Sequence, residues 1–479
     1  MSRRRRILKH APGRAELRGR VALFSPTFLS DDPTLAAVAR FAGRRAVRWT
    51  CALALLGVAV GTVAHSATHG TDFRLNVWYP GQALFHGRDP YDIASFERYY
   101  GVHVREMFSD GWFPLYGPVH LWLAAFFALF PASLASAFWF ALNLAGLAVI
   151  AAVVTKALDR RLGGPAIVAV TALLVLSRPG RANLEIGQAA VFYTLVTYVA
   201  WSQVRRRPWL AAFALAFALG KPPFGLPLLA LLLVRRMWTV LGRGVAVFVV
   251  ASAPLVAWLS VNAGSPASLW HAVIQNLSYT DKNPLDATGS SGRIDALSLI
   301  ARYVHGSFGG AAEVGAFVVV VGIAALVVTR ASAPGGWSLA PAVLMLLGLA
   351  TVLSVAHQYY DLLVLAWPLA AALHDPASRL VDRLGDRPAH RAPTGAPSIE
   401  LGWRAVVLAV SALPALAVTV LPGNETVKIL GLGSGTAIVS TVTTVALLLA
   451  MGGAVVSLAD RPPSATDSSR AAAEDHLAA

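Results

Sequence analysis

The residues best suited to chemistry stand apart from one another in a sequence that is otherwise strongly apolar. Asp72 lies a few residues after the first long apolar block, within Gly-Thr-Asp-Phe-Arg. A carboxylate in that place can act as a general base toward a hydroxyl group, and the alternative is a solvated loop residue. The same stretch also supplies Arg74, Tyr91 and Asp92, which we expect to line the loop and contact an acceptor.

Lys221 places a cation inside an apolar stretch, in the sequence Leu-Gly-Lys-Pro-Pro. A charge at membrane depth costs a few kcal/mol or more unless it is paired. The position therefore predicts a functional cation, with a lipid-linked phosphate as its natural anion. A lysine that extends its ammonium from a helix end toward water is the structural alternative.

Two further polar groups separate apolar segments. Residues 177–188 contain Arg181, whose planar guanidinium would suit a phosphate or a sugar diol, together with the amides of Asn183 and Gln188. A plain polar loop is the alternative. His357 lies in Ser-Val-Ala-His-Gln-Tyr-Tyr-Asp; a lone histidine there is usually structural, but these neighbours favour a binding site. Arg293, in a second polar stretch, is a further cation that could approach a phosphate.

Metal-binding signals are weak. His65 and His69 are four residues apart, a spacing that can put two ligands on one helix face. The acid of a zinc-protease motif is missing between them, so two solvated histidines are the simpler interpretation. Cys51 is the single cysteine, and the sequence has no phosphate-binding Walker loop. We expect no metal and no cofactor other than a lipid-linked donor.

The composition is that of an integral membrane protein. The chain has 479 residues, of which 56% are hydrophobic and 14% are charged, whereas about a quarter of the residues in soluble proteins are charged. Its apolar blocks are long enough to cross hydrocarbon as helices. The net charge of +15 comes from the N-terminal tail and short loops, which is a positive-inside pattern and not a nucleic-acid-binding surface.

These patterns predict an all-α polytopic membrane protein with about 11–13 transmembrane helices and a large extracytoplasmic first loop. We expect a basic cytoplasmic tail at 1–46, a transmembrane catalytic domain at 47–457 and a disordered tail at 458–479. Loops at 65–113 and 263–298 are expected outside, and a loop at 375–403 inside. The expected apolar segments are 47–64, 115–131, 133–155, 164–177, 188–203, 208–220, 222–234, 244–262, 312–329, 338–355, 359–374, 404–421 and 433–457.

If every one of these segments crossed the membrane in turn, the positions of the basic clusters would violate the positive-inside rule. Such crossing would put Lys156–Arg161, and then Arg205–Arg207 and Arg235–Arg243, outside the cytoplasm. One segment before Lys156 is therefore expected not to cross fully. The two short pieces that flank Lys221 are expected to form a re-entrant or short-helix pair, and 115–131 to be interrupted by its prolines.

The motifs in this order resemble glycosyltransferase family 87 over about residues 50–370. The resemblance rests on the Thr-Asp-Phe at 71–73, the Gly-Arg-Asp-Pro-Tyr-Asp at 87–92, Asn183 to Gln188, Lys221-Pro222 followed by Arg235-Arg236, and the late His357. The sequence departs from the family at 113–118, where Phe-Pro-Leu-Tyr-Gly-Pro replaces an expected Tyr-Pro-Pro.

The resemblance implies a GT-C membrane fold of the actinobacterial type. It implies transfer of mannose from polyprenyl-phosphate-mannose to a lipid or lipoglycan acceptor outside the plasma membrane, with inversion to an α-mannoside. Asp72 would be the catalytic base. Lys221, Arg181 and Arg293 would surround the donor phosphate, and His357 would bind phosphate or sugar. Asn183 and Gln188 would bind sugar hydroxyls or orient the donor.

Other functions fit the same sequence. The donor could carry arabinofuranose or glucose in place of mannose. A transporter or flippase of lipid-linked sugars would also need many helices, although such proteins commonly contain inverted repeats and none is visible here. A membrane scaffold without catalysis would tolerate the loss of Asp72 or Lys221, whereas an enzyme would not.

Overall fold

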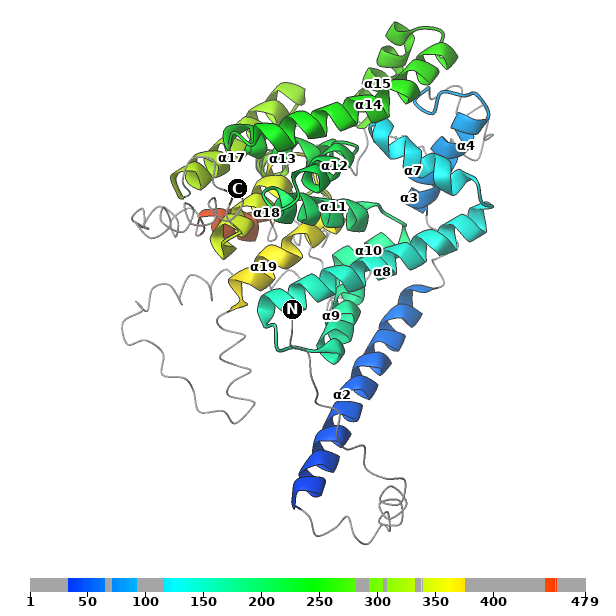
Figure 1. The fold of residues 1–479 in the computed structure, drawn as a ribbon. Coiled ribbons are helices and arrows are strands. Elements are labelled where there is room, and N and C mark those ends of the chain that lie inside the picture. Colours follow the sequence, from blue (N-terminus) through cyan, green and yellow to red (C-terminus); the bar gives the residue numbers. More distant parts are fainter. Residues whose placement is uncertain are drawn as a thin grey trace, which may run out of the picture.

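The chain is an all-α polytopic membrane protein, as the sequence predicts. A computed structural model describes residues 33–64, 71–92, 116–280, 293–304, 308–331, 337, 339–374, 444–452 and 454. Within these ranges every regular element is a helix, and the one extended pairing is an isolated antiparallel bridge between Arg293 and Gln358. Figure 1 shows the helices packed side by side, with α2 projecting from the rest.

Four of the described helices are long and apolar enough to cross a membrane. They are the part of α2 (Pro33–Val63) from Arg45 onward, α8 (Ala132–Leu158), α14 (Trp238–Asn262) and α17 (Gly310–Ala331). A fifth span is formed if α9 (Gly164–Leu176) and α10 (Arg178–Glu185), which are bent by 73°, are taken together.

The first helix is longer than expected. α2 begins at Pro33, so residues 33–46 of the predicted cytoplasmic tail are helical. The reason is local, because this part is rich in alanine and arginine, which favour helix, and proline fits the first turn of a helix. Residues 1–32 lie outside the described ranges, as do the predicted tail at 458–479, the loop at 375–403 and the segment at 404–421. Of the segment at 433–457, residues 444–452 are helical.

The remaining apolar helices are short, and prolines explain why. A helix of 14 residues is about 21 Å long, less than the hydrocarbon thickness of about 30 Å. Proline at the first or second position begins α7, α9, α10, α12, α13 and α18, and it prevents the preceding residues from continuing the helix. The short elements not yet bounded are α7 (Pro118–Ala128), α11 (Ala190–Gln203), α12 (Pro208–Ala218), α13 (Pro222–Val234), α18 (Pro341–Ser354), η3 (Tyr359–Leu365) and α19 (Ala366–Ala372).

The length of α7 bears on the topology. Its 11 residues reach about 16 Å, so α7 does not cross the bilayer by itself. α8 follows it and is long enough to cross. If α2 and α8 cross and α7 does not, the Lys156–Arg161 end of α8 shares the side of the basic N-terminus, as the positive-inside rule requires.

The first loop is folded onto α7. Its described part forms α3 (Thr71–Phe73), the π-helical turn η2 (Arg74–Trp78) and α4 (Tyr79–Phe85). Trp78 Nε1 donates to Phe130 O at 2.9 Å, and Gln82 Nε2 donates to Ala128 O at 2.6 Å. These bonds cap the C-terminal end of α7, whose last carbonyl groups have no partner within the helix.

The second polar stretch, 263–298, is also partly helical. It contains α15 (Pro266–Thr280), and α16 (Ala296–Val304) begins before the stretch ends. In Figure 1, α15 lies beside the outer end of α14, near α4 and α7. The bond from Asn276 Nδ2 to Tyr91 O, 3.0 Å long, joins α15 to the first loop. The two stretches predicted on the same side of the membrane therefore meet.

The bend between α9 and α10 depends on Gly180. A Cβ at this position would collide with the carbonyl of Leu174, and backbone on both sides of the contact cannot move aside. We expect Gly180→Ala to destabilise the protein by about 2 kcal/mol or more, since overpacking typically costs 1–3 kcal/mol. Thermal unfolding of the purified protein measures this. Gly57→Ala in α2 is the control, because nothing lies within 4 Å of its added Cβ, and equal midpoints for the two variants would contradict the prediction.

Candidate active site

The ends and breaks of the short helices meet at one polar centre. Asp72 belongs to α3, Gln188 to the turn between α10 and α11, and Lys221 to the break between α12 and α13. His357 lies in the turn between α18 and η3, and Asp361 lies in η3, which packs against α10 and α11. All five side chains are buried. Segments nearly 300 residues apart thus place polar groups together inside an apolar bundle.

A shared carboxylate lies at this centre. Lys221 Nζ is 2.6 Å from Asp361 Oδ1, and His357 Nδ1 is 2.9 Å from Asp361 Oδ2. The amide of Gln358 also donates to Asp361 Oδ2, at 3.3 Å. Because a buried charge is tolerated when it is paired, the contact with Asp361 explains how Lys221 can be buried here. The sequence predicts a phosphate partner for Lys221 and marks Asp361 only as a polar neighbour of His357, so the contact between Lys221 and Asp361 was not predicted.

Aromatic rings surround the Lys221 ammonium. Its nitrogen is 4.9 Å from the ring centroid of Phe224, 5.4 Å from that of Tyr360 and 6.0 Å from that of Tyr193. Cations within about 6 Å of a ring face are attracted by its quadrupole. An ammonium has three N–H donors, and the hydrogen bond shown by the described residues uses one of them. Lys221 therefore has donors left for a second anion.

Asp72 is held beside Gln188 by backbone contacts. Asp72 N donates to Ile186 O at 2.8 Å, and Gln188 Nε2 donates to the Asp72 carboxylate. Gly187 between them has φ of 76°, and a Cβ there would lie 2.6 Å from Phe73 Cβ. Glycine is required because both the left-handed backbone and this close approach exclude a side chain.

Asn183 connects the two halves of the centre. Its Nδ2 donates to Pro179 O at 2.8 Å within α10 and to Tyr360 O at 3.1 Å in η3. These two acceptors fix the orientation of the amide. Asn183 Oδ1 is buried and has no hydrogen-bond partner among the described residues, so it can accept a bond from a substrate hydroxyl.

The predicted cations differ in their surroundings. Arg181 lies on an exposed face of α10, where its Nε is 2.7 Å from Glu185 Oε1. Arg178, on the same helix, stacks its guanidinium 3.9 Å from the ring centroid of Tyr359 and so lies nearer the turn that holds Asp361. Arg293 is buried and paired with Asp295 and Glu313, at 2.8 and 2.9 Å. The roles of Arg181 and Arg293 at a phosphate stay predictions.

The first loop reaches Gln188 through two tyrosines. Tyr91 is buried and its hydroxyl donates to Tyr116 O at 2.6 Å; the Tyr116 hydroxyl donates to Gln188 Oε1 at 3.3 Å. Arg74 and Asp92 are half-buried in the same loop. The structure thus joins the predicted acceptor residue Tyr91 to the predicted catalytic carboxylate by hydrogen bonds through the Gln188 side chain.

Two polar residues near Lys221 were missed from the sequence, and the contact of Asp361 with Lys221 was not predicted. The spacing of four between His357 and Asp361 is a signal that could have paired the acid with the histidine. His120 and Tyr193 gave no such signal, because each lies within an apolar helix and their contact, 2.8 Å between His120 Nδ1 and the Tyr193 hydroxyl, spans 73 residues. Residues so far apart in sequence become neighbours only through the fold.

No group of three histidine, cysteine, aspartate or glutamate side chains suited to a metal ion occurs among the described residues. His65 and His69, which have the spacing of metal ligands, lie outside those ranges.

Comparison with known proteins gives one match. The model of glycosyltransferase family 87 matches residues 113–356, which is half of the chain. Neither a curated protein nor a solved structure is significantly similar to the chain. The matched region contains Asn183, Gln188 and Lys221, and ends one residue before His357.

Asp89 gives the first loop a pH dependence. Burial raises the pKa of its carboxyl group to about 6, although the Tyr91 amide, bonded to Asp89 Oδ1 at 2.9 Å, lowers it. The folded protein therefore holds this proton more tightly than the unfolded chain, and stability falls as pH rises from about 4 to 6. Asp89→Asn removes this loss, so we expect its thermal midpoint to rise relative to wild type over that range.

Asp159→Asn is the matched control. Hydrogen bonds from Arg161 lower the pKa of Asp159 below 3.8. The stabilisation that ionised Asp159 gives the folded protein is therefore fully present above about pH 4 and lost below it. Its midpoint difference from wild type should stay constant from pH 4 to 7. A constant difference for Asp89→Asn as well would contradict the assignment to Asp89.

Proposed function

Because the chain belongs to glycosyltransferase family 87, we propose that this membrane glycosyltransferase moves mannose from polyprenyl-phosphate-mannose to a lipid-linked or lipoglycan acceptor, with inversion to an α-mannoside. The observation that carries the proposal is that a buried carboxylate, Asp72, and a buried cation, Lys221, are held at turns of the chain that Asn183 links, since Asn183 bonds both α10 and η3. Such a transfer needs a base for the acceptor hydroxyl and a cation for the departing phosphate.

In the proposed reaction, Asp72 takes the proton of the acceptor hydroxyl. The hydroxyl oxygen then bonds to the anomeric carbon, while the bond from that carbon to the phosphate oxygen breaks and the phosphate leaves with the electron pair. The side-chain N–H of Gln188 donates to the Asp72 carboxylate and orients it toward the acceptor. Asn183 Oδ1 accepts a sugar hydroxyl.

Lys221 stabilises the charge that builds on the phosphate. Its ammonium stays on Asp361 and gives a second hydrogen bond to a phosphate oxygen. The site is preorganised, because Asp361, His357 and the surrounding rings fix the cation before the donor arrives, and fixed charges cost no reorganisation during reaction. No metal or further cofactor takes part in this proposal.

The proposed site faces the extracytoplasmic side of the plasma membrane. The argument is the charge distribution: if α7 does not cross, Lys156–Arg161 and Arg205–Arg207 share the side of the basic N-terminus, as the positive-inside rule requires. Gln188 lies between these clusters in sequence, and Lys221 lies between Arg205–Arg207 and Arg235–Arg243. Both therefore approach the opposite side, where a lipid donor places its head group.

The central experiment is transfer from radiolabelled polyprenyl-phosphate-mannose to lipid acceptors in membranes that contain the protein. We expect Asp72→Asn to lower transfer about 100-fold or more, the usual contribution of a general base, while expression stays near normal. Asp159→Asn, which removes a buried carboxylate distant from the centre in sequence, should stay active. Near-normal transfer by Asp72→Asn would contradict its role as base.

Donors with arabinofuranose or glucose on the same lipid phosphate test the sugar. If label is transferred from only one of these donors, the protein is still a glycosyltransferase, but its donor sugar is that sugar and not mannose. Absence of label from every donor, with folded wild-type protein and endogenous acceptors present, would count against the proposed lipid-linked donor class.

Lys221→Ala should weaken use of the donor by roughly tenfold to a hundredfold in kcat/KM, because charge-assisted hydrogen bonds contribute about 1.5–3 kcal/mol. Lys221→Ala also leaves Asp361 without its cation, so thermal stability is measured in parallel. The double variant Lys221→Ala/Asp361→Asn should recover stability and still use the donor poorly. Lys156→Ala, which removes an exposed cation, is the control; an unchanged donor KM and rate for Lys221→Ala would exclude a phosphate role.

A further inference from the structure

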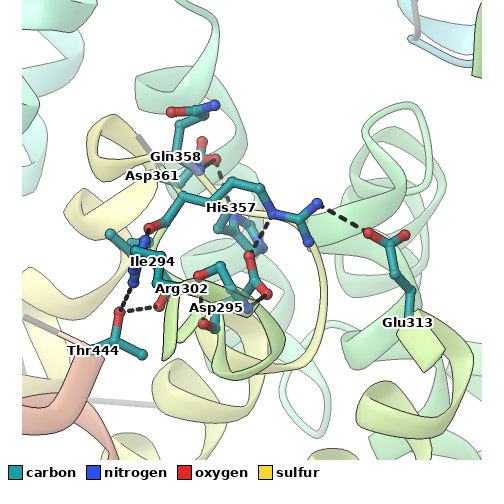
Figure 2. Close-up of polar contacts among 10 residues, drawn as sticks. Ile294, Asp295, Arg302, Glu313, His357, Gln358, Asp361 and Thr444 are labelled. Carbon is teal, nitrogen blue, oxygen red and sulfur yellow. Dashed lines mark hydrogen bonds and ion pairs between the residues drawn. The ribbon is translucent and has the colours of Figure 1, made fainter. Parts of the chain in front are cut away.

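The helix at residues 444–452 contacts the segment that supports His357. Thr444 is fully buried, and its hydroxyl donates to Ile294 O at 3.1 Å. Arg302 Nη2 lies 3.5 Å from the same hydroxyl, and Arg302 Nη1 donates to Arg293 O at 2.9 Å. Figure 2 shows Thr444 entering this group from the C-terminal helix. Two successive carbonyls of one segment are thus held by side chains.

The same segment pairs directly with the turn that carries His357. Ile294 N donates to His357 O at 2.9 Å, and Arg293 forms an antiparallel bridge with Gln358. Thr444 and His357 therefore bind the carbonyl and the amide of one residue, Ile294 (Figure 2). A shift of the C-terminal helix would move the backbone partner of His357.

Residues 293–298 can move as one unit because their own side chains are held by hydrogen bonds. Arg293 Nε bonds Asp295 Oδ2 at 2.8 Å and Arg293 Nη1 bonds Glu313 Oε1 of α17 at 2.9 Å. Asp295 Oδ1 accepts the Ser298 amide at 3.0 Å, and the Ser298 hydroxyl donates to Asp295 O at 2.7 Å. Arg293, Asp295 and Ser298 are all buried.

We propose that Thr444 is a positioning residue: with Arg302 it forms a latch that holds the Ile294 segment against His357 and thereby sets the His357–Asp361–Lys221 group. The effect on sugar transfer rests on the proposed function. Thr444 lies well beyond residue 356, where the family match ends, so the latch is a contribution of the C-terminal part of this chain to the site.

Thr444→Val tests the latch because valine keeps the shape of threonine and removes its hydroxyl. We expect kcat for transfer to fall roughly fivefold to tenfold, as for the loss of one buried hydrogen bond, with an unchanged donor KM. Thr444→Ser, which keeps the hydroxyl, should restore the rate. In a His357→Ala background, Thr444→Val should have a smaller effect on kcat than in wild type, because part of what it positions is already lost and coupled residues are non-additive; fully additive losses would show a merely structural role and overturn the proposal.

Hydrogen exchange tests the latch without any assay of activity. In Thr444→Val, amide exchange should accelerate in peptides covering 293–298 and 357–361, and stay unchanged in α8. Unchanged exchange in the first two regions would overturn the latch, whether or not the wild type transfers sugar. Faster exchange together with a wild-type transfer rate would overturn the positioning role.

Discussion

The ion pair between Lys221 and Asp361 is the contact on which the rest of the centre depends. Each charge alone would be unfavourable inside an apolar bundle, where the loss of hydration costs several kcal/mol per ion. Together they join the break between α12 and α13 to the turn before α19, across 140 residues of sequence. Removing either partner leaves the other buried without its counter-charge, so the two elements can pack closely only as a pair.

Prolines create the breaks that this pair holds together. A broken helix exposes backbone groups that water cannot reach inside the bilayer, so each break must find hydrogen-bond partners within the protein. Here the breaks and loop turns satisfy one another: Gly117 N donates to Gly220 O at 2.8 Å, and Asp72 N to Ile186 O at 2.8 Å. The prolines therefore place inside the bundle backbone groups that their own helices leave unpaired. Side chains next to these breaks, such as Lys221 beside Pro222, lie inside the bundle as well.

The sequence predicted the helices well because their signals are local. Apolar segments and prolines placed most of the apolar helices from α7 to α19 within a few residues, whereas α10, α15 and α16, which lie in stretches that read as polar, were not predicted as helices. The cost of a lone charge identified Lys221. The partner of that charge was not predicted, because nothing near residue 221 points to residue 361. The pairing of Arg293 with Asp295 and Glu313 was missed for a similar reason: Glu313 lies 20 residues away in α17, and an arginine in a polar stretch has the same pattern whether it meets a carboxylate or a phosphate.

The two reactive groups of the proposed site are supported by different parts of the chain, and their relative position depends on few contacts. The turn at Gly187 holds Asp72, whereas η3 holds the Lys221 ammonium through Asp361. Asn183 bonds both α10 and η3, so it connects these supports directly. An inverting transfer requires base and leaving group on opposite sides of one carbon, and geometry of that kind tolerates little misplacement. In the proposed reaction, the buried amide of Asn183 therefore has a second role besides accepting a sugar hydroxyl, because its two hydrogen bonds hold α10 to η3 and so hold the support of Asp72 to that of Lys221.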